Sequence, residues 1–333
     1  MTSSISVALC THNGAAYLSA QLESIIRQSV PPQEIVISDD ASHDGTRAIV
    51  TSFRDECARS HPSIAVKFIE NEQPLGVTQN FQQAVLTCTG DYIALSDQDD
   101  VWLPDRLAVS RAAMESRGLS LVGGDARLIN AEGRDTGETL FGSLGISPRE
   151  LKEMHSGRGF DALLRRNLVT GATAMVSRRT VELAVPFPHP WVHDEWLAII
   201  AAATGTIDLI ERQLIGYRQH GGNQIGVRTL TLGEKFRKLV EPAMSRGEYL
   251  ANRGEVLSER LDVLGFAVNE RDRTAAKHKA RHLRVRRDLS PHPISRIGSI
   301  ISEACVGNYS RYSRGLADVV RDLLQSKRRD HGR

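Results

Sequence analysis

The sequence is poor in the cysteines that stabilise small extracellular domains. Its 333 residues include only four, Cys10, Cys57, Cys88 and Cys305, and no two of them form a CxxC pair. This spacing predicts neither a disulfide framework nor a zinc site. Unpaired thiols are typical of a reducing compartment, so we expect a cytoplasmic protein.

Long hydrophobic runs and an export signal are also lacking. The longest apolar run, LAIIAAATG at 197–205, is much shorter than the ~20 residues that a membrane-spanning helix needs. The N-terminus, MTSSISVALC, has no basic segment before its apolar residues, which argues against a secretory signal. We therefore expect a chain that does not cross a membrane, although it could lie on the surface of one.

Charge is spread unevenly along the chain. The net charge is only +2, but residues 1–228 carry 20 Lys and Arg against 27 Asp and Glu, whereas residues 229–333 carry 22 against 13. The sequence thus predicts an acidic globular domain over 1–228 and a basic region over 229–333. A basic region can bind anionic lipid, nucleic acid or an acidic partner, or it can be the solvated face of helices.

Strand and helix patterns alternate four times at the start of the chain. Predicted strands at 5–10, 34–38, 64–71 and 91–100 alternate with predicted helices at 17–29, 44–60, 76–90 and 103–116. This alternation is typical of an α/β fold with a mostly parallel sheet covered by helices. Further along, the patterns indicate strands at 119–130 and 207–220, a helix at 194–203, and only helices in 229–333.

Polar side chains follow three of the predicted strands, at 11–13, 38–40 and 97–100. Because the carboxyl ends of parallel strands meet at one edge of a sheet, where ligands bind, these side chains should share one crevice. Asp97, Asp99 and Asp100 repel one another unless a cation compensates them. Mg²⁺ prefers one or two carboxylates with waters and phosphates. A solvated acidic turn is the alternative, and the position at a strand end favours the metal.

A second pair of acids, Asp39 and Asp40, ends the second predicted strand. A carboxylate there could accept the imide N–H of uracil or thymine. Alternatively, one of these acids or Ser42 could cap the helix that follows. Both can hold, because one aspartate can bind the base while its neighbour caps.

Six segments together resemble the family 2 glycosyltransferases, which have the nucleotide-binding GT-A fold. They cover about residues 4–225 in the expected order: VALCTHNGAAYLSAQLESIIRQS, EIVISDDASHDGT, NEQPLGVTQNFQQAVLTCTGDYIALSDQDDVWLPD, LVTGATAMVSR, HDEW and YRQHGGN. The wording of SDQDDVWLPDRL and YRQHGGN is most similar to bacterial polysaccharide enzymes often described as rhamnosyltransferases.

The resemblance implies a donor site and a metal site. It implies that Thr11 and Asp39 contact the nucleoside, that Asp97 lies near the ribose, and that Asp99 holds a metal ion on the diphosphate. Asn13 belongs with the binding residues, as part of the polar cluster after the first strand. The implied metal is Mg²⁺ or Mn²⁺.

The remaining implied residues lie further along the chain. Asp194 in HDEW matches the catalytic base, His220 in YRQHGGN can complete the metal site, and Gly171 in LVTGATA lies where the family lines the acceptor side. Taken alone, Asp194 could cap the helix that it opens, His220 could be a surface histidine, and Gly171 could belong to a plain turn. Asn223, in the loop after His220, is a further candidate donor.

The resemblance therefore implies a metal-dependent enzyme that moves a sugar from a UDP- or dTDP-sugar, with dTDP-rhamnose as one candidate. The implied acceptor is a hydroxyl of a glycan or lipid-linked acceptor in bacterial surface polysaccharide synthesis. One base without a second nucleophile indicates inversion. A non-catalytic sugar-nucleotide scaffold or sensor is the alternative. A nucleotidyltransferase would need a basic phosphate loop, and LCTHNGAAYL contains no Lys or Arg.

The basic region suggests a contact with a membrane. Residues 277–287 hold six Lys and Arg and no acid, and an isoleucine stripe follows within 294–304. A basic stretch beside an amphipathic helix suits an anionic membrane, here the inner face of the cell membrane. The alternative is that the stripe packs on the catalytic domain or on a second subunit of a homo-oligomer. Nucleic acid is disfavoured, because aromatics are not interleaved with the basic residues.

Overall fold

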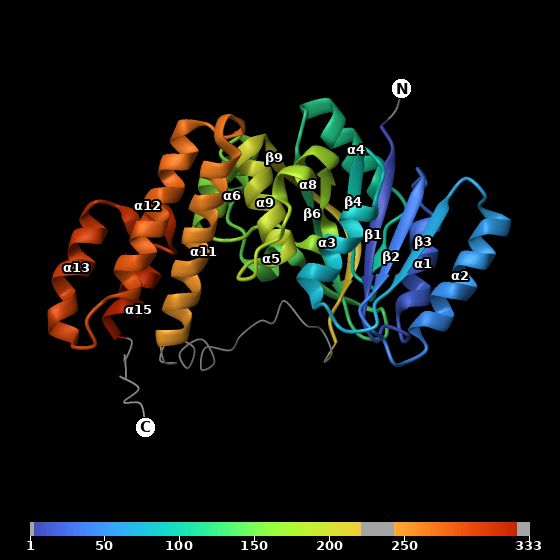
Figure 1. Ribbon diagram of the computed structural model, residues 1–333, viewed down its shortest axis with the longest axis horizontal. Coiled ribbons are helices and arrows are strands. Elements are labelled where there is room, and N and C mark those ends of the chain that lie inside the picture. Colours follow the sequence, from blue (N-terminus) through green and yellow to red (C-terminus); the bar gives the residue numbers. More distant parts are fainter. Residues whose placement is uncertain (1–2, 221–242, 325–333) are drawn as a thin grey trace. The chain divides into compact units, whose positions relative to one another are not determined.

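The structure is a computed structural model that describes residues 3–220 and 243–324, and these form two compact units (Figure 1). The first unit comprises residues 3–159 and 168–220, and the second comprises 160–167 and 243–324. The domain boundary predicted at residue 228 lies outside the described residues, as does Asn223.

The first unit is built on one sheet with the strand order β3-β2-β1-β4-β8-β6-β9-β5, and β7 pairs with β6. The strands are β1 (Ile5–Thr11), β2 (Glu34–Asp39), β3 (Ala65–Glu70), β4 (Tyr92–Ser96), β5 (Val101–Trp102), β6 (Leu121–Ile129), β7 (Asp135–Thr139), β8 (Met175–Ser177) and β9 (Ile207–Arg218). Strands β3, β2, β1 and β4 are parallel, whereas β8 runs antiparallel to both β4 and β6. The sheet is therefore mixed but mostly parallel at its N-terminal half.

Helices flank this sheet, and most of them bury the apolar residues of one face, whereas α9 is buried on nearly all sides. In the order of the chain they are α1 (Leu18–Ile26), α2 (Thr46–Ser60), α3 (Val77–Thr87), α4 (Arg106–Arg117), α5 (Leu140–Leu144), α6 (Pro148–His155), α8 (Arg178–Ala184) and α9 (His193–Thr204). Helix α3 buries Phe81, Ala84 and Val85 and packs against β1 and β2. Helices α4 and α9 pack against β6.

The register of the parallel strands brings three loops to one edge of the sheet. Thr11 at the end of β1 pairs with Asp39 at the end of β2, and Leu9 of β1 pairs with Ser96, the last residue of β4. β1 and β2 are buried along their whole length, which suits the continuous apolar runs of a parallel sheet. The crevice predicted from the polar strand ends is thus formed by adjacent strands.

The second unit is helical over its described residues (Figure 1). It contains α7 (Gly159–Arg165), α11 (Ala243–Leu264), α12 (Glu270–Arg287), α13 (Pro293–Cys305), α14 (Asn308–Tyr312) and α15 (Leu316–Leu324). Helix α11 packs along α12, and α13 packs on α14 and α15 around Leu289, Ile300 and Tyr309. No described helix is long and apolar enough to cross a bilayer.

Helix α7 joins this unit from an earlier position in the chain. Lys279 Nζ donates a hydrogen bond to the carbonyl oxygen of Leu164 at 2.6 Å, and Arg271 forms an ion pair with Asp161. The sequence did not indicate that residues 160–167 leave the first unit.

Candidate functional site

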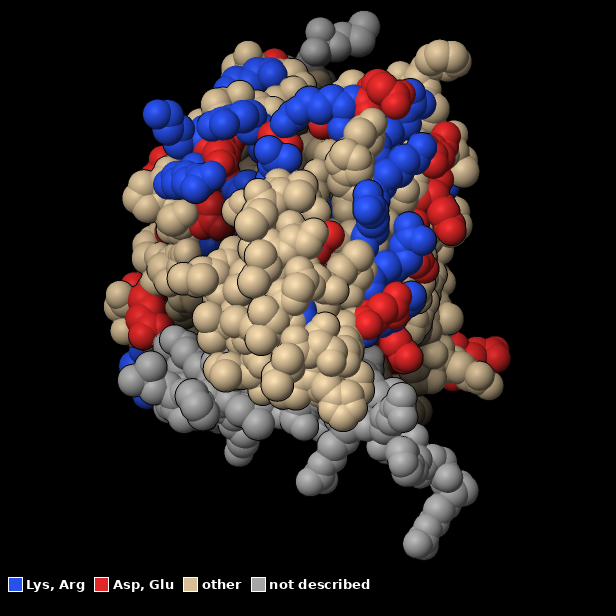
Figure 2. All heavy atoms as spheres, turned by 90° about the vertical axis from the view of Figure 1, so that its left-hand side faces the viewer, with Lys and Arg blue, Asp and Glu red and all other residues tan. Residues whose placement is uncertain are grey.

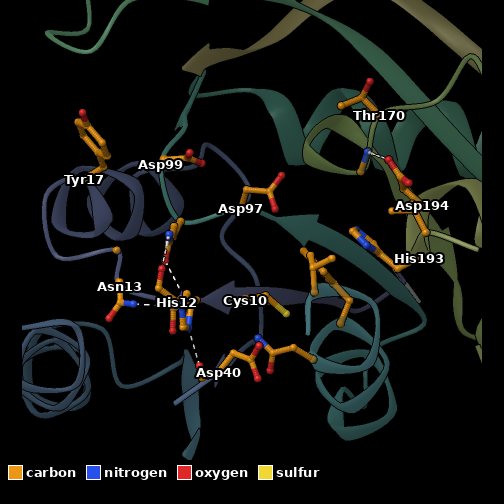
Figure 3. Close-up of a pocket in the computed structure, with 18 of the residues that line it drawn as sticks. Cys10, His12, Asn13, Tyr17, Asp40, Asp97, Asp99, Thr170, His193 and Asp194 are labelled. Atoms are coloured by element: carbon orange, nitrogen blue, oxygen red, sulfur yellow. Dashed lines mark hydrogen bonds between the residues drawn. The ribbon is translucent and has the colours of Figure 1, made fainter. Parts of the chain in front are cut away.

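A cavity of about 420 Å³ opens where β1 and β4 end (Figure 3). Seven of the eight predicted site residues line it: Thr11, Asn13, Asp97, Asp99, Gly171, Asp194 and His220. They come from the loops after β1 and β4, from the segment before β8, from the start of α9 and from the end of β9. Residues distant in the sequence therefore meet in one pocket.

Asp39 is the predicted residue that does not line this pocket. Its side chain is fully buried, and its carboxylate accepts hydrogen bonds from Thr11 Oγ1 at 2.7 Å and from the backbone N–H of Ser42 at 2.9 Å. Arg47 Nε lies 3.3 Å from Oδ2. These contacts occupy Asp39 within the fold, and its nucleoside-binding role stays a prediction.

The neighbouring Asp40 does line the pocket, which the sequence could not decide. Its carboxylate accepts the backbone N–H groups of Leu75 at 2.6 Å and Gly76 at 3.0 Å. Neither Asp39 nor Asp40 caps the next helix, because α2 begins at Thr46 and its N-cap position is Gly45. Asp40 instead holds the loop before α3 against the end of β2.

The acidic loop after β4 is joined to the loop after β1 by one glutamine. Gln98 accepts the backbone N–H of His12 at 2.8 Å and donates to the carbonyl oxygen of His12 at 3.0 Å. A Cβ atom at Gly14 would lie 2.1 Å from Gln98 Oε1, so glycine leaves the space for this contact. The paired bonds fix Asp97 and Asp99 relative to the end of β1.

The acids of this loop are crowded and sheltered from water, which raises the pKa of two of them. Burial raises the pKa of Asp97 to about 7, and the charges of Asp99 and Asp194 act in the same direction. Burial also raises the pKa of Asp100, again with Asp99 and Asp97 contributing. Asp100 is fully buried, and its Oδ2 has no hydrogen-bond partner among the described residues. The loop is therefore not the solvated acidic turn considered as an alternative.

A buried arginine behind this loop was missed by the sequence analysis. Arg106 is 1% exposed, its guanidinium lies 3.6 Å from the centre of the Trp102 ring, and it donates to the carbonyl oxygen of Leu95 at 2.8 Å. Burial lowers its pKa to about 9, while Asp100 and Asp97 oppose this shift. The available signal was a charged residue among the core-facing positions of α4.

Asp99 and His220, the predicted metal pair, lie next to each other in the lining of the pocket. His220 Nε2 lies 2.8 Å from Asp99 Oδ2. Arg218 holds the acidic loop in place, because its Nε donates to the carbonyl oxygen of Asp99 at 2.6 Å and its backbone N–H donates to Asp100 Oδ1 at 3.0 Å. Tyr17 packs on the His220 ring at a centroid distance of 4.8 Å.

This donor set suits a hard divalent cation that is shared with a substrate. Carboxylate oxygen and imidazole nitrogen are ligands for Mn²⁺, and carboxylates and phosphates are ligands for Mg²⁺. The crowding of Asp97, Asp99 and Asp100 is the electrostatic state that a bound cation relieves. Within the part of the chain that the structure describes, no group of three His, Cys, Asp or Glu could hold an ion alone. Phosphate and water would have to complete the coordination.

Asp194 lies across the pocket from these acids, in the first turn of α9 (Figure 3). Its Oδ2 accepts the backbone N–H of Gly171 at 2.9 Å, and its Oδ1 accepts the N–H of Glu195 at 2.7 Å. The N-cap position of α9 is Val192, so Asp194 is not the capping residue that the sequence offered as an alternative. A carboxylate held at a helix N-terminus is stabilised as the anion and is fixed in direction.

The tryptophans do not contribute to the pocket. Trp102, Trp191 and Trp196 are at most 8% exposed and pack in the interior, and none lines the cavity. All four cysteines are unpaired in the structure, and Cys305 is the exposed one.

Comparison with known proteins was made at the level of families and of individual relatives. A sequence model of the family described as "Glycosyl transferase family 2" matches residues 6–180. The Escherichia coli protein "UDP-Glc:alpha-D-GlcNAc-diphosphoundecaprenol beta-1,3-glucosyltransferase WfgD" is 26% identical over 59% of this chain and 69% of its own length. The Shigella flexneri "dTDP-rhamnosyl transferase RfbG" is 35% identical over 30% of this chain and 34% of its own length.

Solved structures show the same fold at low sequence identity. Staphylococcus aureus TarS 1–349, in complex with UDP-GlcNAc, is 15% identical with a TM-score of 0.55, over 96% of this chain and 81% of that one. The mannosyltransferase PcManGT from Pyrobaculum calidifontis, in complex with GDP-Man and Mn²⁺, is 17% identical with a TM-score of 0.50, over 97% and 87%.

Proposed function

This chain belongs to glycosyl transferase family 2, and we propose that it transfers a sugar from a nucleoside diphosphate to an acceptor hydroxyl with inversion at C1. The observation that carries the proposal is that one pocket holds Asp194 opposite Asp97 and Asp99 (Figure 3), and that His220 also lines this pocket. One wall holds groups for a diphosphate, and the other holds one base.

The reaction that fits this arrangement is a single displacement. The acceptor oxygen attacks C1, the bond between C1 and the phosphate oxygen breaks, and the hydroxyl proton moves to Asp194. The nucleoside diphosphate leaves with the bonding electrons. The N–H groups of Gly171 and Glu195 fix the direction of the Asp194 carboxylate, so that it is oriented before the acceptor binds.

Asp99 and His220 would hold a divalent cation, with Asp97 beside them. A bound Mg²⁺ or Mn²⁺ would neutralise the diphosphate and stabilise its departure as a leaving group. The Mn²⁺ in the PcManGT complex supports this assignment. Arg218 and Gln98 would not contact the cation themselves. They would orient Asp99, because their hydrogen bonds hold the loop that carries it.

We propose a UDP- or dTDP-sugar as donor, with dTDP-rhamnose among the candidates, and a glycan or lipid-linked acceptor in bacterial surface polysaccharide synthesis. The names of WfgD and RfbG support these classes, since one describes a glucosyltransferase with a diphosphoundecaprenol-linked acceptor and the other a dTDP-rhamnosyl transferase. The polar and acidic residues that line the pocket, and its volume, suit a sugar nucleotide.

Asp194→Asn tests the proposal directly. The amide keeps the size of the side chain but cannot accept the proton, so transfer should fall at least about 10³-fold. Binding of the best donor from a calorimetric panel of UDP-, dTDP- and GDP-sugars with Mn²⁺ should survive. Asp194→Glu is the matched variant that retains a base. Turnover of the asparagine variant at the wild-type rate would remove Asp194 from this role, and a wild type that binds no sugar nucleotide would refute the function.

We further propose that the second unit contacts an anionic membrane. On α13, Ile294, Ile297 and Ile301 are 85%, 40% and 55% exposed. Figure 2 shows uncharged residues in the middle of this face, with Lys and Arg, and Asp and Glu among them, along its upper and right-hand edges. Exposed isoleucines can enter the acyl region of a bilayer, and nearby Lys and Arg can contact anionic headgroups. A lipid-linked acceptor would lie in the membrane, so this contact would bring the enzyme to its acceptor.

Sedimentation with lipid vesicles tests this contact. Vesicles that contain phosphatidylglycerol should bind the full chain more strongly than phosphatidylcholine vesicles, and the triple variant I294S/I297S/I301S should lose at least about tenfold in partition. Leu86→Ser is the control, because Leu86 is 53% exposed on α3 of the first unit. Equal binding to both vesicles, or a triple variant that changes only the oligomeric state, would refute the membrane contact.

A further inference from the structure

His193 occupies an unusual position on the wall of the pocket. It is the first residue of α9, is 5% exposed, and lines the cavity beside Asp194. Its imidazole stacks on Phe81 of α3, with ring centroids 3.8 Å apart and planes inclined by 12°. This stacking fixes the plane of the ring, so that only the ring edge, which carries the two nitrogens, can form hydrogen bonds.

Neither ring nitrogen has a hydrogen-bond partner among the described residues. Buried polar groups are nearly always paired, so an unpaired one calls for a specific explanation. Gly171 lies close to Nε2, because a Cβ atom at this position would lie only 2.9 Å from the nitrogen. The protein therefore leaves a donor and an acceptor unpaired next to a cavity that must receive a substrate.

The imidazole is uncharged, which restricts the groups that it can bind. Burial lowers the pKa of His193 to about 3, and the N-terminal end of α9 also disfavours a cation. A neutral imidazole has one N–H donor and one nitrogen acceptor. A sugar hydroxyl can both accept and donate, whereas an ionised phosphate can only accept. The chemistry of this site thus fits a hydroxyl better than the diphosphate.

The depth of His193 indicates which substrate presents that hydroxyl. Figure 3 shows His193 between Asp194 and the residues at the strand ends, Cys10 and Asp40. Asp194 is partly exposed and must face the incoming acceptor, whereas His193 lies deeper, toward the sheet. The sugar of the donor has to lie between the diphosphate groups and the base.

We propose that His193 hydrogen-bonds a hydroxyl group of the transferred sugar and so helps to determine which donor the enzyme accepts. This inference rests on the proposed function. His193 contacts substrate in this account but takes no proton in the reaction. A site that reads a hydroxyl discriminates strongly against donors that lack it or orient it differently.

Calorimetry of His193→Phe can separate sugar binding from nucleotide binding. The probes are two pairs of ligands, UDP with UDP-glucose and dTDP with dTDP-rhamnose. Phenylalanine keeps the stack on Phe81 but removes both nitrogens. In the pair that the wild type binds more tightly, affinity for the sugar nucleotide should fall at least about tenfold and affinity for the nucleotide less than about twofold. The KM for the donor should rise while the KM for the acceptor stays unchanged.

His193→Gln serves as the conservative variant, because its amide also offers one donor and one acceptor group and should recover part of the affinity. Equal losses for nucleotide and sugar nucleotide would show that His193 supports the pocket only structurally and would overturn the inference. No loss for either probe would overturn it as well. If the wild type binds neither sugar nucleotide nor nucleotide, the proposed function itself fails, which this design distinguishes from a failure of His193 alone.

Discussion

Two buried histidines, one in each unit, differ in what their ring nitrogens contact. His282 in the second unit places Nδ1 2.6 Å from Glu303 Oε2 and Nε2 3.0 Å from Ser313 Oγ. His193 in the first unit has no such partners among the described residues. Burial lowers the pKa of both. The difference teaches that burial alone does not mark a functional histidine, whereas burial without partners beside a cavity does.

The acids of the two units differ in the same way. In the second unit, Arg286 lies 2.6 Å from Asp322 and 3.3 Å from Asp318, and Tyr309 donates to Asp322 at 2.7 Å. Burial would raise the pKa of Asp318, but Arg286 lowers it below its usual value. Around the pocket the acids outnumber the cations, and the pKa of Asp97 rises instead. In the second unit an arginine among the acids keeps the pKa of Asp318 low, whereas no Lys or Arg is among the described residues that line the pocket.

The largest effect that would sharpen this comparison is expected from Arg286→Met. Removing this cation leaves buried Asp322 without its arginine and takes one arginine from Asp318, which should cost about 3–5 kcal/mol in the free energy of unfolding. Urea titration followed by circular dichroism measures the loss. Arg287→Met is the control, since Arg287 pairs with Asp288 at the surface and its loss should leave the midpoint unchanged. Equal midpoints for the two variants would break the comparison.

A smaller effect is expected when the two histidines are exchanged for phenylalanine. His282→Phe should cost about 1–3 kcal/mol, because Glu303 and Ser313 lose a buried partner. His193→Phe removes no hydrogen bond within the protein and should melt no lower than the wild type at pH 7.5. Thermal melts of both variants measure the contrast. A His193→Phe protein that is the less stable of the two would contradict it.

The dependence of stability on pH should show the same contrast. Between pH 6.5 and 3 the unfolded chain binds a proton that buried His193 does not, so the wild type loses stability as pH falls through this window. At pH 5 the contribution of this histidine is about 2 kcal/mol. The gap in unfolding free energy between His193→Phe and wild type should therefore widen by that amount from pH 7.5 to pH 5. His282 contributes equally to both proteins, so a constant gap would contradict the assignment.

The smallest effect is expected at an exposed ion pair. Arg27, which follows the last residue of α1, lies 2.5 Å from Glu23 of this helix, and the two side chains are 75% and 56% exposed. Water screens such a pair, so Arg27→Ala should change the free energy of unfolding by less than about 0.5 kcal/mol. Urea titration of this variant, in parallel with Arg286→Met, compares the two losses in the free energy of unfolding. A loss as large as that of the buried arginine would show that burial is not the deciding variable.

Much of the first unit could be predicted because its signals are local. The strands β1 to β4, β6 and β9 and the helices α1 to α4 and α9 lie where the apolar patterns placed them, to within a few residues. The convergence of the strand ends followed from parallel pairing, and seven predicted residues line the pocket. The antiparallel strand β8 was not predicted, since its three residues, Met175–Ser177, are too few to show a period.

The missing parts of the site depend on contacts between distant residues. Whether Asp39 or Asp40 faces the pocket is decided by Ser42 and Thr11, which occupy one carboxylate. The orientation of the His193 ring depends on its stacking against Phe81 from another helix, and the burial of Arg106 depends on the whole core around it. Sequence patterns report which residues are polar, but not which polar atoms the fold leaves unpaired.

The detour of α7 has a consequence for how this polypeptide can be divided. The chain passes from the first unit to the second at residue 160 and returns at 168, so no single cut separates the two. A shortened polypeptide that ends at residue 228 would still carry Asp161 and Leu164 but would lack Arg271 and Lys279, which hold them. The helical unit is thus an integral part of the enzyme, because one of its segments lies within the sequence of the first unit. It is not an appendage that could be added or removed whole.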